Sequence, residues 1–169
     1  QISICPSLLD LTWISYAPNL KFLEVSMCES IEEIVKRVDI CGGEIEENLE
    51  GMLFSRLTTL ILQCLSSLES IYGLALPFPS LEKIKVDNCP NLRKLPIDSN
   101  SAKNSIKMIE GDAIWWDGLQ WEDAATESHF HPYFEQIVNR IWTRTYRMSE
   151  LDTEEEDYDE DEEGHQYET

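Results

Sequence analysis

The chain has 169 residues, of which 33 are acidic and 13 are Lys or Arg, so its formal net charge is −20. The charge is uneven: residues 150–169 hold 12 acidic and no basic residues, and the remaining 21 acidic (33 minus 12) and 13 basic residues leave −8 elsewhere. Neither part offers the basic face that nucleic-acid binding requires. No signal peptide and no run of 18 apolar residues is present, so the sequence predicts no transmembrane helix.

Apolar residues recur with a fixed spacing along residues 1–95. The clearest copy occupies residues 81–95, where six positions fall at offsets 0, 3, 5, 8, 11 and 14. This is the leucine-rich-repeat template L-x-x-L-x-L-x-x-N/C-x-x-L. The residues at offsets 3 and 5 point to one face of a short strand, and offset 8 places a small side chain at the turn that follows. The last two positions suit a tight helical or irregular return.

Four copies of this template follow one another. Their positions are Ile2, Cys5, Leu8 and Leu11; Leu20, Leu23, Val25, Cys28, Ile31 and Ile34; Leu57, Leu60, Leu62, Leu65, Leu68 and Ile71; Leu81, Ile84, Val86, Cys89, Leu92 and Leu95. The first copy is truncated by the start of the chain at Gln1. We therefore expect the chain to be the C-terminal part of a longer protein, with a cut face at its first repeat.

The steps between successive turn positions are 23, 37 and 24 residues. Two of them match the usual repeat length of about 20–29 residues. The long step predicts an insertion at about residues 35–52, where Cys41-Gly42-Gly43 is followed by four glutamates within seven residues. Glycines and carboxylates favour a solvated surface loop over a metal site, because no histidine or regular ligand spacing accompanies them.

Cys5, Cys28 and Cys89 share one position of the template, which predicts free, buried thiols. No C-x-x-C pair is present to suggest a zinc site or a disulfide framework. Free buried cysteines are typical of a reducing compartment, so the expected location is cytoplasmic.

The segment after the repeats predicts a terminal cap. A polar link at residues 98–105 precedes an expected last strand at residues 106–109, which Gly111 ends. The aromatic residues that follow are suited to covering the open apolar side of a last repeat. They are Trp115, Trp116, Trp121, Phe130, Tyr133 and Phe134, with Leu119 among them. Two alternatives are less favoured: stacking of bases or sugars on the tryptophans, and a metal held by His129 and His131, which have no third ligand.

The sequence thus predicts an α/β solenoid, a leucine-rich-repeat horseshoe fragment. Short parallel strands would line its concave side and an irregular or short-helical return its convex side. The predicted divisions are repeats at 1–105, a Trp-rich cap at 106–135, a short amphipathic helix at 136–148 and a disordered acidic tail at 149–169. A membrane-surface role for the helix is disfavoured, since anionic lipid would repel the tail.

Strand alternation predicts the working surface. With the template residues facing inward, the residues between them face the concave side, which solenoids use for protein contacts. Phe22 and Ile61 are apolar positions flanked by charge, as expected of a contact patch. No Ser–His–carboxylate or Cys–His set suggests catalysis, so we expect no enzyme. The predicted protein-binding residues are Phe22, Glu24, Ser26, Thr59, Ile61, Gln63, Lys83, Lys85 and Asp87.

Several segments resemble one known family. They are LDLTW at residues 9–13, YAPNLKFLEV at 16–25, LPFPSLEKIKVDNCPNLRKLP at 76–96, DSNSAKNS at 98–105, WWDGLQWED at 115–123 and FHPYF at 130–134. Together they resemble the C-terminal end of plant coiled-coil, nucleotide-binding, leucine-rich-repeat disease resistance proteins. The resemblance covers about residues 1–135, and the tryptophan segment is its most specific part.

This resemblance implies an intracellular immune receptor of the plant defence response. In that family the repeat domain holds a nucleotide-binding switch off and takes part in recognising pathogen effectors. The implied partners are the receptor's own nucleotide-binding domain and a pathogen effector or guarded host protein. The chain has no G-x-x-x-x-G-K-[ST] loop, so no cofactor is expected here, and ATP or ADP would bind only in the N-terminal part. The implied location is cytoplasmic, with peripheral attachment to the plasma membrane left open.

A second function remains open on the architecture alone. A substrate-recruiting leucine-rich-repeat domain of a ubiquitin-ligase adaptor would share the repeats, with an F-box upstream in place of the nucleotide-binding module.

Overall fold

The computed structural model describes residues 1–37 and 52–137, which belong to one compact unit ending at Ile137. Most of the predicted insertion loop, the predicted helix from residue 138 onward and the whole acidic tail lie outside the described residues.

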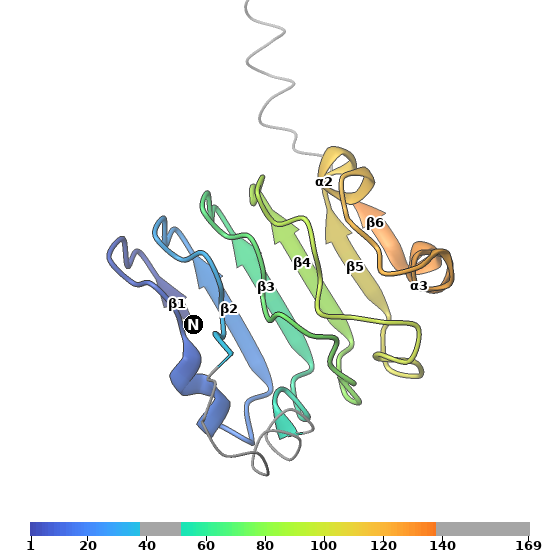
Figure 1. The fold of residues 1–169 in the computed structure, drawn as a ribbon, viewed down its shortest axis with the longest axis horizontal. Helices are drawn as coiled ribbons and strands as arrows, with labels where there is room; N and C mark the ends of the chain where they lie inside the picture. Colours follow the sequence, from blue (N-terminus) through green and yellow to red (C-terminus); the bar gives the residue numbers. More distant parts are fainter. Residues whose placement is uncertain (38–51, 138–169) are drawn as a thin grey trace, which may run out of the picture. The chain divides into compact units, whose positions relative to one another are not determined.

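The core of this unit is a parallel sheet of six strands, ordered as in the sequence. Figure 1 shows them side by side. The strands are β1 (Ile2–Ser3), β2 (Phe22–Ser26), β3 (Thr59–Gln63), β4 (Lys83–Asp87), β5 (Met108–Gly111) and β6 (Phe134–Gln136). The template predicts β2 to β4 at their observed places and β5 within two residues. It does not predict β6: Gln136, where the predicted helix begins, is the last residue of this strand.

The template residues form the buried side of the sheet because the strands pair in register. Leu23, Leu60, Ile84, Ile109 and Phe134 make one continuous inward row, and Ile2, Val25, Leu62 and Val86 make a second. Except for Ile2 and Phe134 at the two edges, these side chains are buried. Strands whose inner face is continuous across neighbours in this way bury a core that no single repeat could bury alone.

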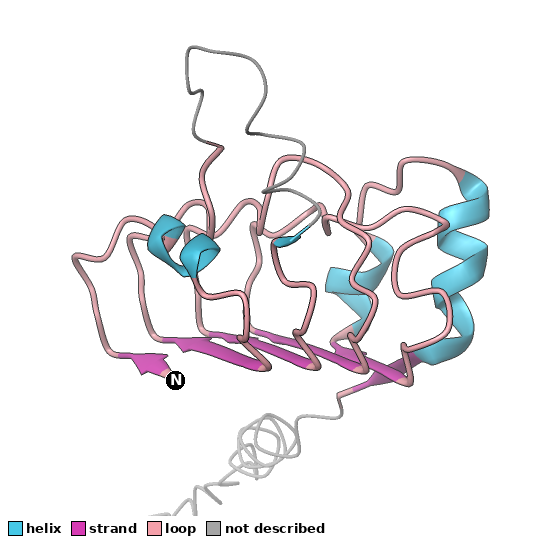
Figure 2. Ribbon diagram, turned by 90° about the horizontal axis from the view of Figure 1, so that it is seen from below, coloured by secondary structure: helices cyan, strands magenta, loops and turns pink. Residues whose placement is uncertain are grey.

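Helices and turns lie on a single side of the sheet (Figure 2). The helical pieces are short: η1 (Thr12–Tyr16), α2 (Ala113–Asp117), α3 (Ala124–Phe130) and η2 (His131–Tyr133). The chain returns between strands over this side, and buried Ile34, Leu68 and Leu92 fill the space beneath the returns. The other side of the sheet carries no helix of the described part of the chain.

One prediction about the returns needs correction. Val35, placed in the insertion loop, is buried, and its N–H donates to the carbonyl of Ile71 at 3.0 Å, so it belongs to the packed repeat. In η1, Trp13 and Tyr16 are 60% and 77% exposed, and only Ile14 is buried. Both exposed rings lie on the first repeat, which has no described neighbour on its outer side.

The turn after each of the first four strands repeats one backbone conformation. Ile4, Met27, Cys64 and Asn88 all have φ between 53° and 56°. In this conformation the N–H of Met27 donates to the carbonyl of Gln63 at 3.0 Å, and that of Cys64 to Asp87 at 2.9 Å. The lateral hydrogen bonds therefore continue one residue past β1, β2 and β3 before the chain turns inward.

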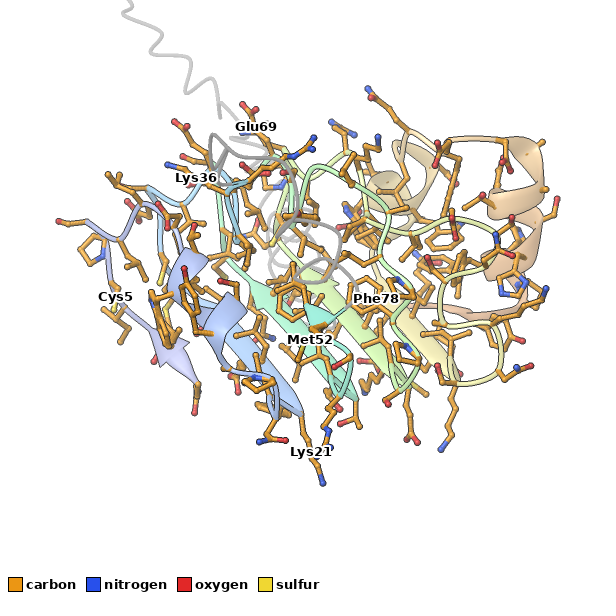
Figure 3. All side chains as sticks on the ribbon, turned by 60° about the horizontal axis from the view of Figure 1, so that its bottom comes forward. Cys5, Lys21, Lys36, Met52, Glu69 and Phe78 are labelled. Carbon is orange, nitrogen blue, oxygen red and sulfur yellow. The ribbon has the colours of Figure 1, made fainter. Side chains whose placement is uncertain are left out.

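The shared cysteine position is buried where neighbours cover it. Cys28 and Cys89 are buried, and their thiols contact the carbonyl oxygens of Ser26 at 3.3 Å and Asp87 at 3.5 Å. Burial raises the pKa of the Cys28 thiol, and raises that of Cys89 to about 12. The expectation fails at Cys5, which is only partly buried because β1 is the edge strand; Figure 3 shows this residue at the outer edge.

The tryptophans pack against the last strands. The ring of Trp116 stacks on Phe134 with centroids 4.3 Å apart, and Trp115 donates from Nε1 to the carbonyl of Leu92 at 3.0 Å. Two short helices, α2 and α3, follow β5. Their N-terminal caps are Asp112 and Asp123, whose carboxylates accept hydrogen bonds from the N–H groups of Trp115 and Thr126. Aspartate at this position satisfies donors that a helix start leaves unpaired.

Candidate protein-interaction face

The open face of the sheet carries the side chains between the buried positions. Pairing across the strands arranges them in three rows, which the register defines. The first row holds Phe22, Thr59, Lys83 and Met108; the second Glu24, Ile61, Lys85, Glu110 and Glu135; the third Ser3, Ser26, Gln63 and Asp87. All nine residues predicted from alternation therefore lie on one face, as the two-residue period of a strand requires.

The nine residues differ in how far they reach solvent. Phe22 is 45% exposed, whereas Ile61, Thr59 and Gln63 are half-buried. Ser26 is only 6% exposed, which corrects its prediction as a contact residue. Its side chain is short, and the register places it between Ser3 and Gln63, which leaves it little access to a partner.

The charges on this face are partly paired. Lys83 Nζ lies 3.0 Å from Glu110 Oε1, a diagonal contact between neighbouring strands. Glu24 accepts a hydrogen bond of 2.9 Å from the Gln1 side chain. Lys85 pairs through its backbone with Ile61 and Glu110, yet its ammonium group makes no ion pair or hydrogen bond within residues 1–37 and 52–137. It is thus the lysine on this face that can pair with an outside group without losing one inside.

Sequence reasoning missed Met108, Glu110 and Glu135 as members of the face. The alternation around Ile106 and Ile109 could have placed the first two outward, but Gly111 stands where the template expects an apolar residue and conceals the match. Glu135 gave no signal, because β6 has three residues and no template positions.

The lysines and carboxylates at the rims do not join this face. Figure 3 shows Lys21 projecting from one edge of the molecule, and Lys36 and Glu69 near the opposite edge. Lys107 lies 2.9 Å from Glu82, immediately before β5 and β4. Lys21, Glu82 and Lys107 stand just before strands, and Lys36 and Glu69 lie on the returns, so none of them belongs to the strand face.

The described residues offer no cluster of three or more His, Cys, Asp or Glu arranged to hold a metal ion. The two histidines considered earlier contact rings: His129 packs edge-on against Phe130 with centroids 4.8 Å apart, and His131 lies 6.5 Å from Trp116. Within the described part of the chain, every helix is too short or too polar to cross a membrane.

Comparisons with known proteins agree with this architecture. A family model described as "Plant disease resistance protein RPS2-like, leucine-rich repeats" matches residues 2–108. The disease resistance protein RPS5 of Arabidopsis thaliana is 40% identical over 134 residues, covering 78% of this chain and 14% of RPS5. The disease resistance protein SUMM2 of the same plant is 37% identical over 149 residues, covering 86% of this chain and 16% of SUMM2. A search of solved structures gave no significant match.

Proposed function

The chain belongs to the leucine-rich-repeat family of RPS2-like plant disease resistance proteins, and on that premise we propose that it is the effector-sensing and autoinhibitory repeat module of an intracellular plant immune receptor. It spans about 15% of the length of the curated relatives it matches, so the activity of a whole receptor is part of this proposal. The ubiquitin-ligase adaptor is not favoured, because the relatives reported above are named as disease resistance proteins.

The observation that carries the proposal is the open face of the sheet. One side of the strands is used to build the core, while the other presents three rows of side chains to solvent or to a partner. Phe22 and Ile61 supply apolar area, and Lys85 supplies a charge that lacks a partner among the described residues. Apolar anchors beside polar groups are what protein interfaces use.

We place both regulatory contacts on this face. In the resting receptor it covers the receptor's own nucleotide-binding domain, and a pathogen effector or guarded host protein competes for it. The effector or host protein binds only receptors in which this face is exposed, so its binding shifts the population of receptors toward the active state. ATP or ADP belongs to the nucleotide-binding domain and not to this chain, and the site of action is the cytoplasm.

In this proposal the strands line the concave side of a horseshoe. The tryptophan cluster, formed by Trp115, Trp116 and Trp121, closes the end of the repeat stack. Trp115 and Trp116 are buried beyond β5, and the hydrogen bond from Trp115 to the carbonyl of Leu92 ties the cluster to the last repeat. A solenoid needs such an end, because its last repeat otherwise leaves an apolar side in water.

Charge reversal at Lys85 tests the proposal. The full-length receptor carrying Lys85→Glu is expressed in leaf cells, and cell death is measured with and without the effector. We expect either cell death without effector or loss of the response, since the reversed charge weakens a contact on this face. Lys83→Glu combined with Lys85→Glu strengthens the effect but also breaks the ion pair with Glu110.

Lys94→Glu is the matched control, because Lys94 is exposed on a return, away from the strands. The same change of charge there leaves signalling at the wild-type level. Wild-type signalling and wild-type partner binding in the Lys83→Glu, Lys85→Glu double variant would overturn the proposal.

A further inference from the structure

A hollow lies beside the tryptophan cluster, away from the strand face. Its volume is about 320 Å³, and Trp116, Asp117, Leu119, Trp121, Glu127 and His131 line it. These residues come from α2, α3, η2 and the turn between the two α-helices. The volume is at the small end of the range for ligand sites, which fits one side-chain head group better than a larger molecule.

The aromatic walls of this hollow are held in place. Trp116 stacks on Phe134, while the rings of Trp121 and His131 stand at 66° and 71° to it, with centroids 5.1 and 6.5 Å away. Trp116 is only 5% exposed. The hollow therefore has aromatic sides that neighbouring rings hold in place.

Acidic side chains line the hollow. Residues 108–137 contain seven acidic residues and no Lys or Arg. Three of the seven have internal roles: Glu110 pairs with Lys83, and Asp112 and Asp123 cap helices. The carboxylates of Asp117 and Glu127, which line the hollow, make no ion pair or hydrogen bond in the described structure.

One cation from another part of the chain, Arg93, lies close to the hollow. The Arg93 guanidinium packs against Gly118, beside the hollow, but it forms no ion pair with Asp117 or Glu127. The hollow thus combines two carboxylates that have no ion pair in the described structure with flat aromatic rings.

We propose that this hollow receives an arginine side chain of a partner protein. A guanidinium group is planar, so it can lie against the rings while its N–H groups donate to the two carboxylates. A lysine ammonium would satisfy the charge but not the flat shape. The site is separate from the strand face, so it does not depend on the function proposed for that face.

The test uses the full 169-residue chain labelled with ¹⁵N. It is titrated with the peptide acetyl-Gly-Arg-Gly-amide while the assigned indole N–H signals of Trp116 and Trp121 are followed by NMR. The control peptide carries citrulline, which keeps the shape of arginine but has no charge. We expect the arginine peptide to shift both signals and to bind roughly tenfold more tightly than the citrulline peptide, because charge-assisted hydrogen bonds are the stronger kind.

Variants separate the hollow from general surface attraction. Asp117→Asn and Glu127→Gln are each expected to weaken arginine binding several-fold, and unchanged shifts of the remaining indole signals verify that the fold is kept. Glu122→Gln is the matched control, since this nearby carboxylate does not line the hollow. Equal binding of the two peptides, equal weakening by Glu122→Gln, or no shift of either indole signal would each overturn the proposal.

Discussion

Individual residues at the strand ends carry a backbone conformation that suits glycine better. Met27 and Cys64 lie in the left-handed region, where a side chain other than glycine costs about 1–2 kcal/mol. Asn88, at the same position of the next repeat, is one of the residues that tolerates it. At Met27 and Cys64, the lateral hydrogen bonds from their N–H groups hold the conformation against that cost.

Replacement of Cys64 by glycine is therefore expected to stabilise the chain. The thiol is exposed, so little packing is lost, and relief of the left-handed strain should raise the free energy of unfolding by up to about 1 kcal/mol. Urea denaturation measures the change. Cys64→Ala is the control, because it removes the thiol but keeps the strained side chain. A glycine variant no more stable than the alanine variant would contradict this explanation.

The thiols of the repeats should differ in reactivity. Burial raises the pKa of Cys28 and raises that of Cys89 to about 12, so both remain neutral at physiological pH, whereas Cys64 is exposed. We expect iodoacetamide to label Cys64 quickly and the two buried thiols only after unfolding, because the thiolate is the reactive form. Mass spectrometry of a Cys41→Ser variant resolves the sites. Rapid labelling of Cys89 in the folded chain would show that its environment is wrongly described.

The raised pKa values of Cys28 and Cys89 also predict that the folded chain loses stability at high pH. The unfolded chain ionises these thiols near the ordinary cysteine pKa of 9.0, while the folded chain keeps them protonated to higher pH. Their contribution is therefore complete below pH 9 and is lost as the pH rises toward the folded pKa.

At the scale of elements, the end of β5 and the start of α2 fit together through one glycine. A Cβ at Gly111 would meet Cζ3 of Trp115 at 2.5 Å, and both residues are buried. The indole cannot move away easily, since its Nε1 is bonded to the carbonyl of Leu92. The absence of a side chain at Gly111 thus lets the Trp115 ring of α2 pack directly against the end of β5.

Gly111→Ala should consequently destabilise the chain by about 1–3 kcal/mol, the usual cost of overpacking a core. Gly118→Ala is a matched control: the nearest atom there belongs to the flexible end of Arg93, and its φ of −86° suits alanine. We expect the control to change stability much less. Thermal unfolding followed by circular dichroism compares the two, and equal losses would exclude the contact with Trp115 as the cause.

These elements also show how far sequence reasoning reaches. Spacing alone predicts β2, β3 and β4, because each has two inward residues followed by a turn position, and the same pattern fixes which side chains face outward. It does not predict β6, which forms through pairing with β5 and not through a pattern of its own. The burial of Ser26 and the free charge of Lys85 depend on neighbouring strands, and the hollow depends on ring packing, so none of these can be read from one repeat.

At the scale of the whole described unit, the two ends of the sheet differ. β1 pairs with β2 through two residues, and the large apolar side chains of Ile4, Leu9, Trp13 and Tyr16 are exposed around it. At the other end, α2 and the tryptophan cluster pack on β5 and β6. Because each repeat is stabilised mainly by its neighbours, this asymmetry should appear as a gradient of local stability.

Native-state hydrogen exchange measures that gradient. The amides of β3 and β4 pair along five residues on their shared side and are expected to be the most protected, and those of β1 the least. The amides of β5 should be protected almost as well as those of β4, because the hydrogen bond from Trp115 to Leu92 ties α2 to the repeat at residues 81–95. Trp115→Phe removes that hydrogen bond and keeps an aromatic ring, so protection should fall in β5 and remain in β3. Equal protection of β1 and β3, or an equal loss in β3 and β5 on substitution, would mean that the unit unfolds as one cooperative block instead of repeat by repeat.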